Sequence, residues 1–149
     1  MENDWKTAEG ILRQLPNLAT AVIDDGGMNV LHVAAGANSS AYFIKQLVDK
    51  YFLRPEDLAL KTRDDYCTAL IYLAQSGDNV EAAKVMIEKN LSLALIRDDL
   101  GSTPVYKAVD WGNRRMAWYL LHVTDLHQLT PADRFLLLRA AIVSDLYGK

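Results

Sequence analysis

A short sequence phrase occurs three times along this chain. It begins at Asn29, Thr68 and Thr103, and its three versions read NVLHVAA, TALIYLA and TPVYKAV. The first residues are 39 positions apart (29 to 68) and then 35 positions apart (68 to 103). Self-similarity at a period of roughly 20 to 50 residues indicates a repeat array. We therefore expect repeated structural units over most of the chain.

The phrase resembles the start of an ankyrin repeat, which has a period of about 33 residues and a Thr-Pro-Leu-His-like beginning. This resemblance implies an all-α solenoid of helix–turn–helix units joined by short hairpin-like fingers. It also implies that the array presents a surface for binding other proteins. We expect about three full repeats plus a half-repeat at each terminus.

Each phrase is followed by a second helical pattern with apolar residues at i, i+3 and i+4, which places three side chains on one stripe. Acidic turn clusters precede the phrases at 24–27, 64–66 and 98–101, where Asp and Gly favour tight turns. Asn29, Thr68 and Thr103 suit helix N-caps. The expected single domain, 1–149, then divides into an N-terminal half-repeat (4–23), three repeats (24–62, 63–97 and 98–129) and a C-terminal half-repeat (130–149).

The two ends of this pattern are incomplete. The N-terminal segment, Trp5 to Leu15, looks like a second helix without a first, and the expected helix from Asp133 to Leu146 looks like a first helix without a second. Repeat arrays normally need polar terminal faces. Either the chain is cut from a longer one or its ends pair with something. The stripes expected to be uncovered are Ile11, Leu12 and Leu15 at one end, and Phe135, Leu136 and Leu137 at the other.

Composition excludes several classes of function. The net charge of −3 and pI of about 5.5 do not favour nucleic acid binding, which needs clustered Lys and Arg. A single cysteine excludes a disulfide framework and a cysteine-rich zinc site, and it suits a reducing compartment. The N-terminus lacks the features of a secretory signal, and the apolar stretch 135–143 is too short to span a bilayer. We expect a soluble, cytoplasmic protein that inserts into no membrane and needs no cofactor or metal.

Longer stretches of the chain are similar to one group of ankyrin proteins. These are DWKTA from Asp4, DLALK from Asp57, EKNLSLALIR from Glu88, WYL from Trp118 and DLY from Asp145. Together they resemble plant ankyrin-repeat proteins of the accelerated-cell-death type, which often carry a membrane-anchored PGG domain. The resemblance implies non-catalytic binding of proteins, often in defence or stress signalling. It does not transfer the membrane anchor, because no such segment is present here.

Several residues that could take part in catalysis or metal binding have structural explanations. His32 is expected to hydrogen-bond the backbone and neighbouring turns, and the other repeats place Ile71 and Tyr106 there. The spacing of His122, Asp125 and His127 matches no zinc pattern, so we expect no metal site. Turn chemistry accounts for one Asp in each of the pairs 24/25, 64/65 and 98/99. The second Asp of each pair is expected to be freer.

The positions of the cysteine and tryptophan residues in the repeat predict whether their side chains are buried or exposed. Cys67 is expected near a finger tip, exposed and unreactive, because no basic neighbour lowers its pKa. Trp111 should lie on the concave face, where it has no core to fill and suits an interface anchor. Trp5 and Trp118 lie on second-helix patterns, so we expect both to pack in the core.

Ankyrin geometry predicts a concave, acidic binding surface and no catalytic residues. Its complement would be a partner with Lys or Arg and an apolar anchor. The alternative is that the acidity only keeps the fingers soluble. A self-assembly module that pairs through the terminal half-repeats is the alternative function, and a small hydrolase or metal enzyme is disfavoured because phosphate-loop and nucleophile motifs are missing. The residues expected to bind the partner are Asp25, Met28, Asp64, Asp65, Cys67, Gln75, Ser76, Asp99, Leu100, Ser102, Asp110 and Trp111.

Overall fold

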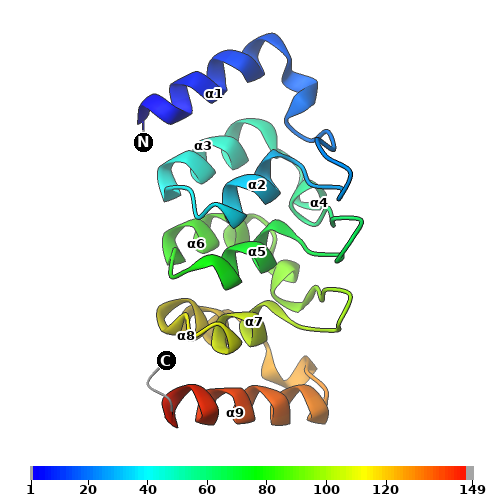
Figure 1. Ribbon diagram of the computed structural model, residues 1–149, viewed down its shortest axis with the longest axis vertical. Coiled ribbons are helices and arrows are strands. Elements are labelled where there is room, and N and C mark those ends of the chain that lie inside the picture. The colour runs from blue at the N-terminus through cyan, green and yellow to red at the C-terminus, as the bar shows by residue number, and fades with distance from the viewer. Residues whose placement is uncertain (1, 147–149) are drawn as a thin grey trace.

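The computed structural model describes residues 2–146, and within them all regular structure is helical (Figure 1). This confirms the expected all-α class. The α-helices are α1 (Glu2–Gln14), α2 (Val30–Gly36), α3 (Ala41–Tyr51), α4 (Pro55–Leu58), α5 (Ala69–Ser76), α6 (Val80–Lys89), α7 (Pro104–Asp110), α8 (Arg114–Val123) and α9 (Pro131–Leu146). Short 3-10 helices lie in the connections, at η1 (Pro16–Leu18), η2 (Leu91–Leu95) and η3 (Leu126–Gln128).

The helices stack in two rows along the long axis of the molecule. The inner row is α2, α5, α7 and α9, and the outer row is α1, α3, α6 and α8; each helix packs on the next in its row. Within a repeat the inner and outer helices also pair, as α2 with α3, α5 with α6, and α7 with α8. The two rows are therefore offset, because α1 begins the outer row and α9 ends the inner row.

The repeated phrase forms the three short inner helices because its first residue caps each of them. The side chains of Asn29, Thr68 and Thr103 accept hydrogen bonds from the backbone N–H three residues on, at 3.0, 3.4 and 3.3 Å. Each cap satisfies a donor that the first helical turn would otherwise leave unpaired. The predicted capping role of these residues is confirmed.

The core lies between the rows and is built by the apolar stripes. Ile44, Leu47 and Val48 of α3 and the corresponding Ala83, Met86 and Ile87 of α6 are buried. Hydrogen bonds from side chains to backbone carbonyls join successive repeats. The Ser76 hydroxyl donates to the Ala35 carbonyl at 2.9 Å, and amide groups of Asn79 and Asn113 donate to the carbonyls of Ser39 and Ala74, each at 2.8 Å.

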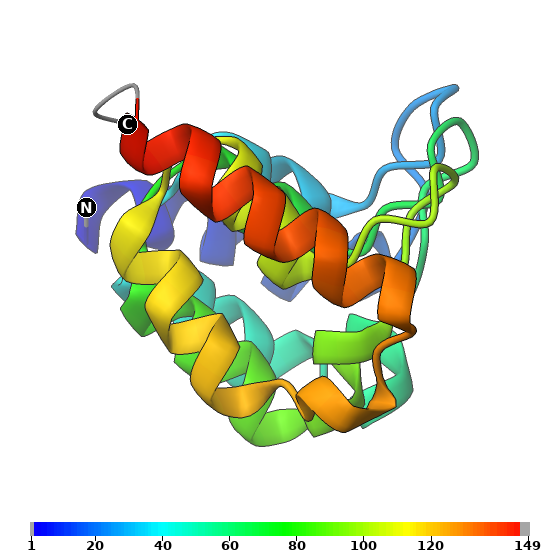
Figure 2. The ribbon, with the colours of Figure 1, turned by 90° about the horizontal axis from the view of Figure 1, so that it is seen from below.

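The segments before the inner helices form three projecting fingers, defined here as residues 23–28, 62–67 and 97–102. They extend together from one side of the stack (Figure 2). A backbone hydrogen bond closes each finger. The N–H of Ile23 donates to the Met28 carbonyl at 2.8 Å, that of Thr62 to the Cys67 carbonyl at 3.0 Å, and that of Asp98 to the Ser102 carbonyl at 3.1 Å. Backbone bonds also connect them: the Gly26 carbonyl accepts from Asp64 at 3.3 Å, and the Asp65 carbonyl accepts from Asp99 at 3.0 Å.

The terminal helices differ in detail from expectation. Helix α1 ends one residue before Leu15, where Pro16 begins η1, and α9 begins at Pro131 because Pro is tolerated at the first helical position. Of the stripes expected to be uncovered, Leu12 and Leu137 are buried because they face α3 and α7, their neighbours in each row. Residues 147–149 of the expected C-terminal half-repeat, including Tyr147, lie outside the described residues.

Candidate functional site

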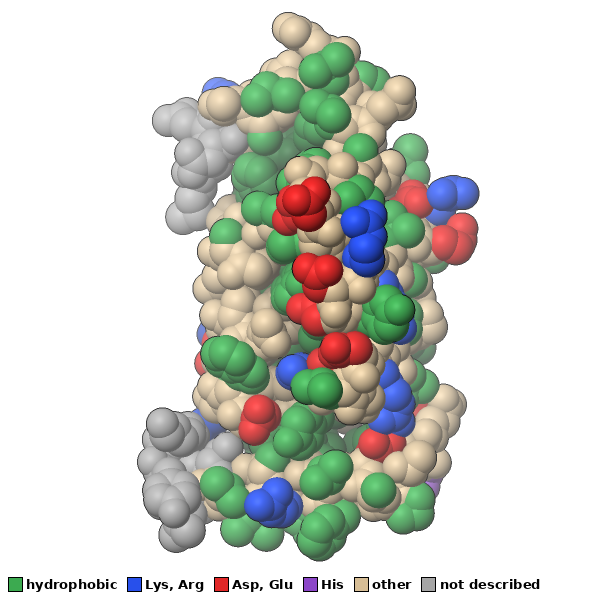
Figure 3. Space-filling view, turned by 45° about the vertical axis from the view of Figure 1, so that its right-hand side comes forward, with side chains coloured by type: hydrophobic (Ala, Val, Ile, Leu, Met, Phe, Trp, Pro, Cys, Tyr) green, Lys and Arg blue, Asp and Glu red, His purple; other side chains and the backbone are tan. Residues whose placement is uncertain are grey.

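The three fingers share one register, which is set by a residue with positive φ. That residue is Gly27 (φ 86°), Tyr66 (φ 52°) or Gly101 (φ 79°), each two positions before the helix cap. Two positions earlier in every finger stands an aspartate, and all three of these aspartates are exposed: Asp25, Asp64 and Asp99. Acidic side chains accordingly gather in a column on the finger side, with basic and hydrophobic groups beside them (Figure 3).

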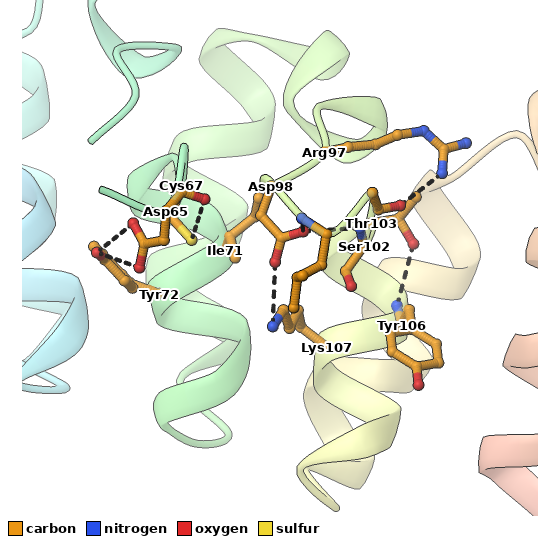
Figure 4. A network of polar contacts seen from close by, with 12 residues as sticks. Asp65, Cys67, Ile71, Tyr72, Arg97, Asp98, Ser102, Thr103, Tyr106 and Lys107 are labelled. Carbon is orange, nitrogen blue, oxygen red and sulfur yellow. Dashed lines mark hydrogen bonds and ion pairs between the residues drawn. The ribbon is translucent and has the colours of Figure 1, made fainter. Parts of the chain in front are cut away.

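The first and third fingers use a second aspartate to hold their own turn. The Asp24 carboxylate accepts from the N–H of Met28 at 3.0 Å, and the equivalent Asp98 carboxylate accepts from that of Ser102 at 2.8 Å. Asp98 is buried and lies 3.2 Å from the Lys107 ammonium group on α7 (Figure 4). In these two fingers the second Asp of the pair is the freer one, as expected.

The second finger reverses these roles, so the expectation for Asp65 was wrong. Arg63 occupies the position of Asp24, and the Thr62 hydroxyl instead accepts from the N–H of Cys67 at 3.0 Å. Asp65 accepts hydrogen bonds from the hydroxyls of Thr62 and Tyr72, the latter at 3.1 Å (Figure 4). Burial alone would raise the pKa of Asp65, but these bonds outweigh it and lower that pKa. Burial and Asp65 together raise the pKa of Tyr72 to about 12.

Cys67 is not the exposed finger-tip thiol that was expected. It is only 3% exposed, whereas Met28 and Ser102 at the same position of the other fingers are half-buried. Burial and the nearby carboxylates of Asp65 and Asp98 raise the pKa of its thiol to about 12. The group therefore stays a protonated thiol and lies too deep to contact a partner.

His32 connects the first repeat to the second finger, which confirms its structural role. Its Nδ1 accepts from the N–H of Asn29 at 3.0 Å, so the proton lies on Nε2. Nε2 then donates to the carbonyls of Leu60 at 2.9 Å and Cys67 at 3.1 Å. Burial lowers the pKa of His32, although the two carbonyls act in the opposite direction.

Other residues that were predicted to bind a partner lie on or next to the inner helices. Gln75 and Ser76 of α5 are half-buried, and Ser76 is occupied by its bond to Ala35. Asp110 is exposed at the end of α7, and the next residue, Trp111, is 59% exposed. On the fingers, Met28 and Ser102 are half-buried, whereas Leu100 is 80% exposed. Whether these residues bind a partner stays a prediction.

The other two tryptophans behave differently from each other. Trp5 is buried and meets the Phe43 ring edge-on, with ring centroids 5.4 Å apart. Trp118 is 70% exposed, so the expectation that it packs was wrong. Its position on α8 corresponds to those of Lys45 on α3 and Lys84 on α6, which also face solvent.

Sequence reasoning missed Tyr66 as a member of the finger surface. Its side chain is exposed at the position that glycine occupies in the other two fingers. A large residue in the left-handed region is uncommon, and such outliers often mark functional positions. Aligning the three fingers on their helix caps would have revealed it, because Tyr66 then falls opposite Gly27 and Gly101.

The described residues show neither a metal centre nor a membrane span. Within residues 2–146 there is no group of three or more His, Cys, Asp or Glu side chains that could hold a metal ion. Among the same residues, no helix is long and apolar enough to cross a bilayer. Every buried polar side-chain atom in the described part of the chain has a hydrogen-bond partner.

Comparison with known families agrees with this architecture. The family model described as ankyrin repeats (3 copies) matches residues 31–129, which is more than half of the 149-residue chain. The chain belongs to the ankyrin-repeat family. A comparison with curated proteins gave no match. Ankyrin repeats are generally modules for protein–protein interaction, and the family is typically non-catalytic.

Proposed function

We propose that this protein is a non-catalytic binding module that presents the finger row and the adjoining inner helices to a protein partner. The observation that carries the proposal is the register of the fingers, which places an exposed aspartate at the same point of each repeat: Asp25, Asp64 and Asp99. Backbone bonds between the fingers fix these groups relative to one another. A preformed surface loses little ordering entropy on binding.

The chemistry of this surface favours a partner that carries a basic segment and an apolar anchor. The exposed carboxylates would complement Lys or Arg side chains and would steer association. Exposed Leu100, Trp111 and Tyr66 offer apolar area beside the charges. Tyr and Trp bury much area with few rotatable bonds, which makes them frequent hot spots.

A peptide selection tests this proposal directly. Displayed random peptides would be selected on the wild-type protein and then compared for binding to the variant Asp25→Asn, Asp64→Asn, Asp99→Asn. We expect the selected peptides to be enriched in Lys and Arg, and to lose about tenfold or more in affinity for the variant. Their binding should also weaken between 50 and 300 mM salt, concentrations chosen because charge screening increases across them.

A charge-matched control separates the finger surface from a general effect of acidity. The variant Asp49→Asn, Glu81→Gln, Glu88→Gln removes the same number of charges from exposed positions on α3 and α6. The selected peptides should bind this control as they bind wild type. Equal losses in both variants, or peptides without basic residues, would contradict the proposal.

The biological setting is proposed on the resemblance alone. Similarity to plant ankyrin proteins of the accelerated-cell-death type suggests a cytoplasmic role in defence or stress signalling. This setting predicts that affinity capture with wild-type protein, compared with a Trp111→Ala, Leu100→Asp variant, recovers signalling proteins of that kind. Capture of the same proteins by both baits would argue against binding through the concave face.

Self-assembly is the second candidate function. The specific observation in its favour is that both ends of the stack expose large apolar side chains. They include Ile11 of α1 and Leu15 directly after it, and Phe135 and Leu136 of α9. Extended apolar patches on a surface usually mark interaction sites.

A further inference from the structure

We propose that His32 is a pH switch, whose protonation detaches the second finger from the first repeat and weakens binding at the finger surface. This inference rests on the proposed function and adds a way to regulate that same site. The contacts of one buried imidazole carry it, together with the place of the second finger in the row.

The His32 ring holds both ends of the second finger against α2. Its Nε2 donates to the carbonyl of Leu60, just before the finger, at 2.9 Å, and to the carbonyl of Cys67, the last finger residue, at 3.1 Å. The Cys67 carbonyl also accepts the backbone bond from Thr62 that closes the finger. A single side chain of the first repeat therefore fastens the base of the second finger.

This fastening is specific to the second finger. The residue of α5 that corresponds to His32 is Ile71, whose hydrocarbon side chain has no group to donate to the third finger. A change in the state of His32 should therefore act on the second finger first.

The second finger is the middle one, and backbone bonds join it to both neighbours. Its Asp64 N–H donates to the Gly26 carbonyl of the first finger, and its Asp65 carbonyl accepts from the Asp99 N–H of the third. Detaching this finger therefore disturbs the spacing of the exposed aspartates along the whole row.

Protonation of His32 is incompatible with the closed arrangement. Nδ1 accepts from the N–H of Asn29 at 3.0 Å, so a proton added to Nδ1 would set two donors against each other. Asn29 is buried and its N–H would lose its acceptor, which is costly, and His32 itself is only 1% exposed. Both costs disappear when the ring reaches water, which requires the base of the finger to separate from α2.

The groups around the ring do not compensate for its burial. Burial lowers the pKa of His32, although the Leu60 and Cys67 carbonyls and the carboxylates of Asp65 and Asp24 act in the opposite direction. Helix α5 adds the ring of Tyr72, which meets the imidazole edge-on with centroids 5.8 Å apart. The other charged side chains on α3, on the first two fingers and directly before the second are exposed: Asp25, Lys45, Asp49, Lys50, Lys61, Arg63 and Asp64.

The direction of the pH response follows from this lowered pKa. In the detached state the ring is in water and regains the ordinary pKa of 6.5, so that state binds the proton more readily than the closed state. Detachment is therefore favoured as the pH falls below about 6.5, and the effect saturates once the closed state is protonated too.

Cys67 provides a reporter for detachment. It is the only cysteine in the chain, and it is 3% exposed at the base of the second finger, so a reagent reaches its thiol only when the finger opens. We would label it with 4,4′-dithiodipyridine between pH 7 and pH 5, where histidine titrates. The rate for an unstructured peptide with the same local sequence, measured at each pH, converts these rates into protection factors.

Protection of Cys67 should fall below pH 6.5, by at most about tenfold per pH unit. The variant His122→Gln with His127→Gln removes the two exposed histidines and should keep this response. His32→Gln should show weaker protection that no longer depends on pH. As a matched control, Cys67→Ala with Ser102→Cys moves the thiol to the same position of the third finger, where protection should stay constant.

Nuclear magnetic resonance of the His122→Gln, His127→Gln protein observes the remaining imidazole directly. We expect a proton on Nε2 at pH 7 and a pKa of His32 below 6.5. A proton on Nδ1 at pH 7 would overturn the proposal, and so would protection of Cys67 that stays constant while His32 titrates. These two results decide the matter even if His32→Gln does not fold.

Histidine-free peptides selected on the finger surface test the effect on binding. Their affinity for wild type should fall about fivefold or more between pH 7 and pH 5, within the usual range of coupling between two sites. His32→Gln keeps every aspartate and should show a smaller loss. A fall in Cys67 protection without a fall in affinity would overturn the proposal.

The two readouts also separate this proposal from the proposed function. If no peptide can be selected, the proposed function fails, whereas a fall in Cys67 protection still supports the detachment of the finger. Normal peptide binding together with protection that does not depend on pH would overturn only the switch.

Discussion

At the residue scale, Tyr66 combines an exposed side chain with a backbone conformation that usually requires glycine. The left-handed conformation places Cβ close to the following carbonyl oxygen, at a cost of about 1 kcal/mol for a non-glycine residue. The equivalent residues, Gly27 and Gly101, do not carry this cost. Because the strained residue is a surface aromatic, its presence fits a binding role better than a stabilising one.

The variants Tyr66→Gly and Tyr66→Ala separate the two properties of this side chain. Both remove the aromatic ring, but only glycine relieves the backbone strain. We expect Tyr66→Gly to have a free energy of unfolding about 1 kcal/mol higher than Tyr66→Ala, measured by urea denaturation. Peptides selected on the finger surface should bind both variants more weakly than wild type. Equal stability of the two variants would contradict the strain argument.

His32 should make stability depend on pH in a window below neutrality. Burial lowers its pKa from the ordinary value of 6.5, so near pH 6 the folded state binds fewer protons than the unfolded state. Its contribution is therefore complete above about pH 6.5 and is lost as the pH falls through the folded-state pKa. The loss should be at most about 1.4 kcal/mol per pH unit.

Urea unfolding at pH 7.5, 6.5 and 5.5 checks this expectation. The variant His32→Gln should be less stable throughout but should show a flatter dependence on pH. The carboxylates with lowered pKa values, such as Asp65 and Asp133, titrate below their ordinary value of 3.8 and act outside this window. The same slope in wild type and variant would assign the effect to another group.

Roles set by local hydrogen bonding could be predicted from the sequence, whereas roles set by packing between repeats could not. The capping by Asn29, Thr68 and Thr103 follows from residue type and position alone. The inward turn of Cys67 and the bond from Tyr72 to Asp65 depend on how the second finger meets α5. Trp118 is an exception, because its alignment with Lys45 of α3 and Lys84 of α6 already indicates a position that faces solvent.

At the element scale, α9 is tied to the third finger by one ion pair. The Arg97 guanidinium donates to both carboxylate oxygens of Asp133, and also to the Gly101 carbonyl at 2.8 Å. Asp133 also accepts from the N–H of Thr130, whose hydroxyl accepts in turn from the N–H of Asp133. Hydrogen bonding from Arg97 holds the pKa of Asp133 far below its ordinary range.

Removing this tie should loosen α9 without unfolding the repeats. We expect Arg97→Met to lower the local stability of α9 by about 1 kcal/mol, since the pair is only partly shielded from solvent. Hydrogen exchange should then speed up in 131–146 and stay unchanged in α5 and α6. Lys45→Met, which removes an exposed pair with Asp49 on α3, is the control. Faster exchange along the whole chain would contradict a local role.

The sequence predicted the paired helices of the repeats and their order, because the repeated phrase and its apolar stripes are local signals. It also predicted that α1 begins the outer row and that α9 ends the inner row, as they do within residues 2–146. It did not predict α4 or the three 3-10 helices. It did not predict which side of α9 would face α7. Apolar residues lie all round that helix, so the pattern alone does not select a buried face.

At the scale of the whole molecule, each repeat contacts only its neighbours, so the cost of a cavity should depend on where it lies. Leu73 of α5 is fully buried in the middle of the stack. Leu73→Ala should lower the free energy of unfolding of the entire array by about 2–5 kcal/mol. Leu137→Ala on α9 should mainly detach that end helix. Urea unfolding followed by hydrogen exchange would show a shifted main transition for the first variant and an almost unchanged one for the second.

The backbone bonds that join the fingers have a mechanical consequence. Hydrogen bonds link Gly26 to Asp64 and Asp65 to Asp99, so a movement of one finger is coupled to a movement of the next. Small bends at the junctions between repeats would open or close the distance between successive fingers. A partner that contacts all three fingers would hold the stack at one curvature. The loss of flexibility would extend along the stack to helices that the partner does not contact.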